Sequence, residues 1–375
     1  MGANTLIEWA ANPDGSPGNT WNPIRARDRQ TGLEGTFCVH ASDGCRNCYA
    51  ETFQARKLPR NGIGLPYAAQ YLDRVDFFLA ENVLTKPLQT RKPSTFFLSS
   101  LTDPFGEWVT DEWLDRMFAV MALCPQHVFV VLTKRAERMR RYLTVTDPRR
   151  LETDVGKRVW KAAYRIETGK EILHSGAPWP LPNVILMVSA EDQKTADARI
   201  PLLLRTPAAW RGVSCEPLLA PVDLTAIDIN GEGTLNALTP YTFEEAIADW
   251  RDTSPTWEED FEDWFGELPT GTGPMHKTLD WVIAGFESGP KARIPIVEAA
   301  RSLRDQCAAS GTPFDFKQWG EWAPVELTHP GDRRAFDEAT GMARVGKAKA
   351  GRHLDGVLHS ARPAIFTQAS GGERS

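Results

Sequence analysis

Six short apolar runs constrain the fold of this chain more than any other feature of its sequence. Each run is rich in β-branched or aromatic residues and stops abruptly at polar residues, as buried parallel strands do. The runs are Thr95–Leu98, Val128–Leu132, Val184–Val188, Gly212–Val213, Trp281–Ala284 and Pro313–Phe316. Amphipathic stretches of helical period lie between several of them, at residues 111–124, 194–206 and 297–311, and Gly311 is the expected C-cap of the last. The alternation predicts an α/β protein with a complete or partial (βα) barrel of TIM type.

Polar residues follow each apolar run. In βα barrels the active site lies at the C-terminal ends of the strands, so we expect these polar residues to converge there. They are Ser99, Ser100, Asp103, Thr133, Lys134, Arg135, Ser189, Glu191, Asp192, Ser214, Glu216, Glu287, Ser288, Lys317, Gln318 and Glu321. The glycines of GFESG, Gly285 and Gly289, allow a ligand to approach the backbone closely.

Three cysteines lie within eleven residues near the N-terminus, Cys38, Cys45 and Cys48, and they predict a metal site. The Cys45–Cys48 pair has a spacing that can place two thiolates on one metal, and Gly44 permits a tight turn. A 4Fe–4S cluster held by three cysteines leaves one iron open for a substrate or cofactor. A zinc ion takes four protein ligands in a structural site, and His40 would complete that set. The spacing alone leaves both metals open.

Composition indicates a soluble, cytoplasmic protein. Hydrophobic residues make up 42% and charged residues 25% of the chain, as is ordinary for a globular protein. The sequence shows neither a secretory signal nor an apolar run long enough to span a membrane. The formal net charge of −6 argues against broad non-specific binding of nucleic acid, although a local basic groove stays open. Cys124, Cys215 and Cys307 are scattered in apolar stretches, where we expect them to pack as reduced thiols.

The rhythm of strands and helices divides the chain into a barrel, an insertion and an extension. We expect the barrel over residues 1–322, interrupted by an acidic, tryptophan-rich insertion at residues 225–279. Residues 323–375 form a C-terminal extension with a basic cluster, and its last residues are expected to be disordered. The basic cluster is RVGKAKAGRHLDG, in which Arg344, Lys347, Lys349, Arg352 and His353 stand close together.

Several sequence blocks resemble one known family. They are TWNP at 20–23, GCRNCYAE at 44–51, SSLTDPF at 99–105, LTKRAERM at 132–139, VSCEPLL at 213–219, GFESG at 285–289 and FKQWGEW at 316–322. With these blocks the chain resembles a phage-derived family, of mycobacteriophage type, whose domain has no defined function. That family carries a three-cysteine motif and is considered radical-SAM-like. The matching blocks run in order over about residues 5–225 and 278–356.

The resemblance implies a radical-SAM-like barrel in which Cys38, Cys45 and Cys48 hold a 4Fe–4S cluster. The open iron would then take S-adenosyl-L-methionine, and an electron from the cluster would cleave its sulfonium to give a radical. The protein would exclude water and aim that radical at one hydrogen of a substrate. In this chain the first cysteine gap is six residues instead of the usual three, and SSLTD stands where such enzymes carry Gly-Gly-Glu.

The same resemblance implies roles for the polar residues at the strand ends. The expected catalytic residues are Lys134, Glu191, Glu216, Glu287 and Lys317. The expected cofactor-binding residues are Ser100, Asp103, Arg135, Ser189, Ser214, Gly285, Ser288 and Gly289. A carboxylate among them would bind the amino group or ribose of S-adenosylmethionine, and Lys134 or Arg135 its carboxylate.

Three classes of function stay open at this point. The first is an iron–sulfur radical enzyme acting on a small molecule, nucleobase or nucleotide, because phages often place such chemistry in base-modification pathways. The second is a zinc-stabilised barrel acting as a hydrolase or transferase. The third is a non-catalytic barrel that assembles with a protein partner encoded nearby.

Overall fold

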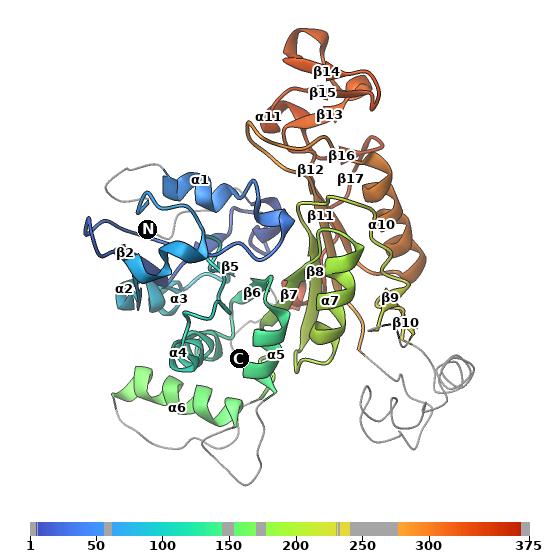
Figure 1. Cartoon of the computed structure of the whole chain (residues 1–375). Helices are drawn as coiled ribbons and strands as arrows, with labels where there is room; N and C mark the ends of the chain where they lie inside the picture. The colour runs from blue at the N-terminus through green and yellow to red at the C-terminus, as the bar shows by residue number, and fades with distance from the viewer. Residues whose placement is uncertain are drawn as a thin grey trace.

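Seven parallel strands form the central sheet of the computed structural model, which describes residues 5, 7–55, 62–144, 154–169, 178–229, 231, 233–240 and 277–368. The strands are β1 (Asn19–Trp21), β5 (Thr95–Leu98), β6 (Val128–Thr133), β7 (Val184–Ser189), β8 (Trp210–Cys215), β11 (Trp281–Gly285) and β12 (Phe314–Gln318). They lie side by side in the order of the sequence, and the sheet curls into a half-barrel (Figure 1). This order is the one that successive right-handed βα units produce.

Helices follow most of the sheet strands and cover the outer face of the half-barrel (Figure 1). They are α4 (Asp111–Ala122), α5 (Ala136–Leu143), α6 (Val155–Thr168), α7 (Gln193–Leu204) and α10 (Val297–Ser310). Their ends carry the expected signals: Asp192 forms a capping box with Thr195, and Gly311 ends α10 with a φ of 74°. The expected C-cap of the last helix is therefore confirmed.

The side chains of the sheet alternate between two separate cores. On the outer face, Phe96, Phe129 and Val282 pack against the apolar sides of the helices. On the inner face, Phe97 and Ile283 belong to a second core that fills the half-barrel. Period-two alternation in strands buried on both faces explains why the sequence showed continuous apolar runs.

The two ends of the chain fill the open side of the half-barrel. The short 3₁₀ helix η1 (Glu8–Ala10) contacts both β5 and β12, and its Trp9 ring lies 4.8 Å from Phe97 and 6.0 Å from Trp281, measured between centroids. From the other end, Phe366 of α12 (Ile365–Gln368) packs 5.4 Å from the same Trp281 ring. Arg362 joins the two ends by donating to the carbonyl oxygens of Ala11 and Glu8 at 2.9 and 3.1 Å.

The segment between β1 and β5 builds a small antiparallel sheet in the order β3–β2–β4. Its elements are β2 (Ile24–Asp28), β3 (Glu34–Gly35), η2 (Asp43–Cys45), α1 (Tyr49–Ala55), η3 (Ala69–Arg74), β4 (Val75–Leu79), α2 (Glu81–Leu84) and α3 (Lys86–Gln89). A third core of Phe37, Tyr67 and Val75 holds it together, with Cys38 and Cys48 packed against that core. The cysteine motif therefore lies on a folded subdomain.

The C-terminal residues form a projecting module and then return to the half-barrel (Figure 1). Their elements are β13 (Trp322–Pro324), η4 (Val325–Leu327), η5 (Pro330–Asp332), β14 (Ala335–Asp337), β15 (Met342–Arg344), α11 (Lys347–Ala350), β16 (His353–Leu354), β17 (Val357–Leu358) and α12. Strands β13, β15 and β14 form one antiparallel sheet, and β16 pairs with β17. Disorder is expected over residues 367–375, but Thr367 and Gln368 belong to α12, and residues 369–375 lie outside the described residues.

The expected insertion at residues 225–279 is described only at its two ends. Its first part forms the β9 (Ile227–Asp228) and β10 (Thr234–Leu235) hairpin, whose Ile227 and Leu235 join the outer core beside α7. These residues belong to the packed body of the protein. The rest of the expected insertion, residues 241–276, lies outside the described part of the chain.

The fold confirms the α/β class and the partial form of the predicted barrel. Within the described residues, the edge strands β1 and β12 do not pair with each other, so these strands form a half-barrel and not a closed TIM-type barrel. None of the described helices is both long and apolar enough to cross a membrane.

Removing the ring of Trp281 should destabilise the protein strongly, because this side chain joins both chain ends to the inner core. We expect Trp281→Ala to lower the free energy of unfolding by about 3–5 kcal/mol, as for other buried aromatic truncations. Phe336→Ala is the control, since this ring is 54% exposed and its loss should cost less than about 0.5 kcal/mol. Urea unfolding compares the two, and equal effects would contradict the inner core as described.

Candidate functional site

A cavity of about 430 Å³ opens at the carboxyl ends of the sheet strands. Its volume lies within the range of small-molecule sites, about 300–1,000 Å³. Apolar side chains, including Trp9, Phe97, Leu132 and Phe286, line part of it. The inner core of the half-barrel continues into this lining, because Trp9 and Phe97 belong to both.

Most of the residues predicted from the strand ends line this one cavity. They are Ser99, Ser100, Asp103, Thr133, Lys134, Arg135, Ser189, Ser214, Glu216, Glu287, Ser288, Lys317 and Gln318, together with Cys38, Cys45 and Cys48. Glu191, Asp192, Gly285, Gly289 and Glu321 do not line it. Glu191 is only 1% exposed beneath the surface of the site, and the N–H of Gly289 donates to Glu321 at 3.1 Å. Gly285 makes room for a neighbour, since a Cβ there would lie 2.5 Å from Oε1 of Glu216.

Hydrogen bonds to its backbone fix the first part of the cysteine loop, residues 37–48. The Thr102 hydroxyl donates to the carbonyl of Phe37 at 2.6 Å, and the Arg135 guanidinium donates to the carbonyl of Val39 at 2.8 Å. Arg135 itself is held at 3.1 Å by Asp103. The ends of β5 and β6 therefore position the segment around Cys38.

Polar contacts also fix the second part of the same loop. Asn47 donates to Glu287 at 3.0 Å and to the carbonyl of Lys291 at 2.9 Å. Arg293 pairs with both Glu287 and Asp43, at 2.5 Å in each case. The loop after β11 therefore holds the segment that carries Cys45 and Cys48.

Gly44 is required for close approach and not for an unusual backbone angle. Its φ is not among the positive values of this chain, so the expected tight turn does not depend on glycine. A Cβ at this position would lie only 2.4 Å from the side chain of Glu191. The backbone of the cysteine loop at Gly44 is therefore in close contact with the buried side chain of Glu191.

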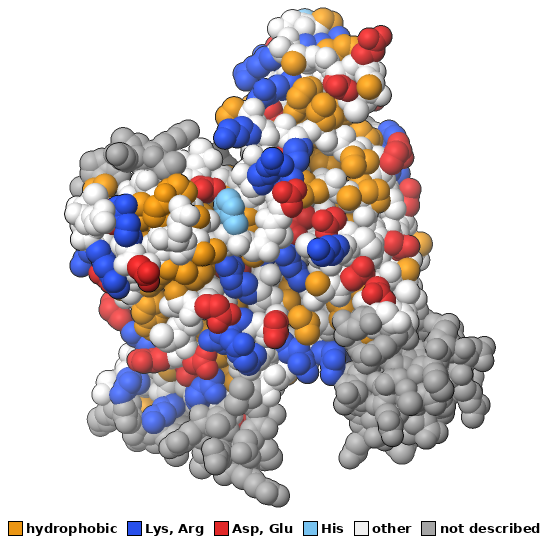
Figure 2. Space-filling model, viewed as in Figure 1, with side chains coloured by type: hydrophobic (Ala, Val, Ile, Leu, Met, Phe, Trp, Pro, Cys, Tyr) orange, Lys and Arg blue, Asp and Glu red, His pale blue; other side chains and the backbone are white. Residues whose placement is uncertain are grey.

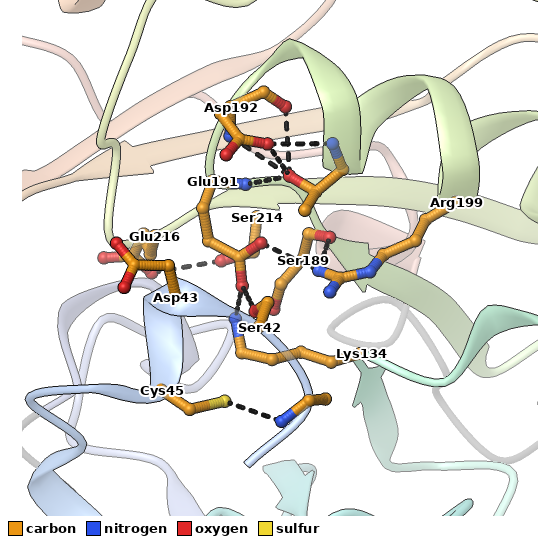
Figure 3. A network of polar contacts seen from close by, with 12 residues as sticks. Ser42, Asp43, Cys45, Lys134, Ser189, Glu191, Asp192, Arg199, Ser214 and Glu216 are labelled. Carbon is orange, nitrogen blue, oxygen red and sulfur yellow. Dashed lines mark hydrogen bonds and ion pairs between the residues drawn. The ribbon is translucent and has the colours of Figure 1, made fainter.

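Glu191 joins four elements through its carboxylate (Figure 3). The Lys134 ammonium at the end of β6 and the Arg199 guanidinium of α7, at 2.8 Å, are its cationic partners. The Ser42 hydroxyl of the cysteine loop donates to it at 2.8 Å. Burial alone raises the pKa of Glu191, but the charges of Lys134 and Arg199 outweigh burial and lower that pKa to about 2.

Glu216, which directly follows β8, is the centre of a second group of polar contacts. Its carboxylate accepts from the Trp9 indole at 3.3 Å and from the Ser214 hydroxyl at 3.2 Å, and it pairs with Lys317 at 3.1 Å. Trp9 therefore links the chain ends that fill the half-barrel to the polar groups of the cavity.

Cys38 and Cys48 pack against the apolar third core. Burial raises the pKa of Cys38 to about 12 and also raises the pKa of Cys48. His40 makes a 2.9 Å contact with Glu51, and this contact engages its Nε2. Among the described residues, no three His, Cys, Asp or Glu side chains stand in a ready-made metal-binding group. The three thiols line one cavity, but they are not preassembled as ligands around a single metal position.

Most of the basic cluster of the C-terminal extension is neutralised by ion pairs. Lys347 pairs with Glu8 at 3.2 Å, Arg352 with Asp315 at 3.3 Å, and Lys349 with Asp332. Arg344 likewise lies 3.4 Å from Glu321. Basic and acidic side chains are interspersed over the face drawn in Figure 2. The predicted basic cluster is therefore not a continuous positive surface.

Several residues that build the site were not predicted from the sequence. Trp9, Ser42, Arg199 and Arg293 hold the two carboxylates or the cysteine loop, yet each lies outside the strand ends. Only Arg199 had a local signal, because an arginine among the apolar residues of an amphipathic helix requires a buried partner. The partner of Trp9 lies 207 residues away in sequence, and no local pattern reveals it.

The fold and the site define a class: a mixed α/β protein with a half-barrel sheet and a cysteine-lined cavity at its carboxyl ends. A family model described as "Protein of unknown function (DUF5131)" matches residues 4–363, and the chain belongs to that family. Comparison with curated proteins gave no match, and comparison with solved structures also gave none. The expected family of undefined function is confirmed at this level, while its phage origin and radical-SAM-like character stay predictions.

The buried carboxylate should control stability in acid. Because the pKa of Glu191 falls from its ordinary 4.5 to about 2 on folding, its contribution is present above pH 4.5 and is lost as pH falls toward 2. Glu191→Gln leaves Lys134 and Arg199 without a counter-charge, which should cost about 3–5 kcal/mol at neutral pH.

Urea unfolding at a series of pH values measures both effects. In Glu191→Gln, the free energy of unfolding should no longer show the pH dependence that Glu191 contributes. The free energies of unfolding of the variant and the wild type should therefore differ less in acid than at neutral pH. Glu298→Gln, at a 75% exposed side chain, is the control and should behave like the wild type. A constant difference across this pH range would contradict the role given to Glu191.

Proposed function

We propose that this protein is an iron–sulfur enzyme of the radical S-adenosylmethionine type, acting on a small molecule such as a nucleobase or nucleotide. One observation carries the proposal: Cys38, Cys45 and Cys48 line a single cavity that also contains apolar side chains and lies at the carboxyl ends of parallel strands. Active sites of βα barrels occupy this position.

The donor set fits a cluster with three protein ligands better than a four-ligand zinc site. Three thiols border the cavity, whereas the nearby His40 is engaged with Glu51. A 4Fe–4S cluster held by Cys38, Cys45 and Cys48 would supply the electron that cleaves the sulfonium of S-adenosylmethionine. The raised pKa values of Cys38 and Cys48 mean that metal binding must displace their protons.

The chain's own polar groups differ in how open they are to a bound molecule. Lys134 and Arg135 are already paired with Glu191 and Asp103, so they act first as supports of the cysteine loop. Among the three candidate carboxylates, the side chain of Glu216 is 13% exposed, that of Glu287 6% and that of Glu191 1%. Glu216 is thus the best placed to accept from a cofactor's ammonium or ribose.

The apolar lining gives the space between the cysteines and the strand ends a mainly hydrophobic surface. Trp9, Phe97 and Phe286 contribute large rings to it, and Leu132 adds an aliphatic surface. Reactive intermediates survive longer in such a space, and charge interactions there are stronger than in water.

Metal analysis tests the proposal directly. After anaerobic purification or reconstitution, the wild type should hold about four irons and four sulfides per chain, with a visible chromophore. Cys45→Ala and Cys48→Ala should lose them, because each removes a thiol from the cavity. Cys307→Ala is the matched control, since this cysteine of α10 is buried in the outer core and does not line the cavity.

His40→Ala separates the two metals. Retention of iron in this variant supports a cluster held by three cysteines. One zinc per chain, lost in both His40→Ala and Cys45→Ala and with no iron after reconstitution, would overturn the proposal in favour of a Cys₃His zinc site.

Binding of S-adenosylmethionine gives a second test. Glu216→Gln should keep the iron of the wild type but weaken binding of S-adenosylmethionine by about tenfold, as expected for loss of a charged hydrogen bond. Equilibrium dialysis of the reconstituted proteins measures this, with Glu298→Gln as the control on the outer surface. Unchanged affinity in Glu216→Gln would exclude this carboxylate as the cofactor's partner.

A further inference from the structure

Two residues that line the cavity each carry a buried side-chain atom with no hydrogen-bond partner. These atoms are the hydroxyl of Ser99, a residue 3% exposed, and Oε1 of Gln318, a residue 7% exposed. Among the buried, unpartnered side-chain atoms of the described residues, these two belong to residues that line the cavity. Buried polar groups are nearly always satisfied, so an orphaned pair at one cavity points to a ligand.

Ser99 also has an unusual backbone. Its φ is +54°, a region that residues other than glycine seldom adopt, and it follows directly on β5. Its N–H donates to the carbonyl of Trp21 at 2.7 Å, and its own carbonyl accepts from Thr102 at 3.2 Å. The surrounding sheet therefore holds this serine in a strained conformation, as is common at binding sites.

The Gln318 amide has a fixed orientation. Its Nε2 donates to the carbonyl of Phe286 at 3.0 Å, and the N–H of Phe286 donates back to the carbonyl of Gln318 at 3.1 Å. Because only the NH₂ end can donate to a carbonyl, Oε1 is the end left free. A bound molecule must therefore offer an N–H or O–H group to Gln318.

Trp9 connects the two orphaned groups. Its helix η1 contacts both β5, which Ser99 follows directly, and β12, which ends at Gln318. Trp9 lines the same cavity and packs edge-on against Phe97. This part of the site thus combines an aromatic surface with one free acceptor and one hydroxyl that either donates or accepts.

The charges of the cavity are already balanced. Lys134, Arg135, Lys317 and Lys347 line it, and each is paired with a carboxylate, of Glu191, Asp103, Glu216 and Glu8 respectively. No cation among these four is left over for a phosphate. A neutral ligand suits such a site better than a highly charged one.

We propose that Ser99 and Gln318 bind the polar edge of a neutral nucleobase of the substrate, presented as a free base or a nucleoside. A base offers a planar ring for the aromatic lining, an N–H or amino donor for Gln318, and a second polar atom for Ser99. The substrate assignment rests on the proposed function, and the two fail separately, because iron content tests one and nucleoside binding the other.

Calorimetric titration of the reconstituted protein with adenosine, guanosine, cytidine and thymidine tests this site. At least one should bind, and Ser99→Ala should weaken it about tenfold without lowering the melting temperature, because the hydroxyl has no partner in the free protein. Ser302→Ala, which removes a hydroxyl from the exposed side of α10, should bind like the wild type.

Altered ligands test Gln318 without altering the fold. An analogue that lacks the exocyclic amino group or ring N–H of the preferred base should bind about tenfold more weakly to the wild type and to Ser99→Ala alike. The corresponding 5′-monophosphate should bind no more tightly than the nucleoside.

Three results would overturn the assignment: no nucleoside bound at millimolar concentration, equal affinity in Ser99→Ala, or a Ser99-dependent affinity for S-adenosylmethionine alone. The last result would assign the two groups to the cofactor's adenine instead of a substrate. A monophosphate bound more than tenfold tighter than its nucleoside would overturn the choice of a neutral ligand.

Discussion

The buried carboxylate of Glu191 is the interaction on which the rest of the site depends. It lies after β7 and joins Lys134 at the end of the neighbouring strand β6, Arg199 of α7 and Ser42 of the cysteine loop. The buried carboxylate stays ionised only because two cations surround it. The positive charges of those two cations are in turn stabilised only by the ionised carboxylate. The backbone of the loop lies directly against it at Gly44. A change at this one residue would therefore displace the thiols without touching them.

The sequence predicted the central sheet well because its strands are buried on both faces. Continuous apolar runs such as Thr95–Leu98 and Trp281–Ala284 match β5 and β11 to within a residue. The edge strand β1 escaped prediction, since its three residues give too short a pattern. Closure of the barrel was not predictable either: a half-barrel and a full barrel share the same βα alternation, and what fills the open side depends on contacts between the two chain ends.

The part of the candidate site that the sheet topology brings together could be predicted from the sequence. The part that individual long-range contacts bring together could not. Strand-end residues such as Lys134, Glu216 and Lys317 had to converge once the strands were parallel and adjacent. The sequence did not reveal that Glu191 is a support beneath the cavity, or that Gly285 serves as space for Glu216. Such roles depend on depth below the surface, which a strand-end position does not specify. Glu51, the partner of His40, lies in the first turn of α1. The direction in which the His40 side chain points could not be predicted from the sequence, and the zinc alternative depended on it.

The meeting of the two chain ends at Trp281 has a consequence for biosynthesis. Trp9 leaves the ribosome well before Phe366, and both rings contact the same indole. The sheet strands can pair as each βα unit emerges, but the inside of the half-barrel stays partly uncovered until Phe366 has emerged. A product truncated before Phe366 would present an unfilled apolar interior to cellular proteases and chaperones.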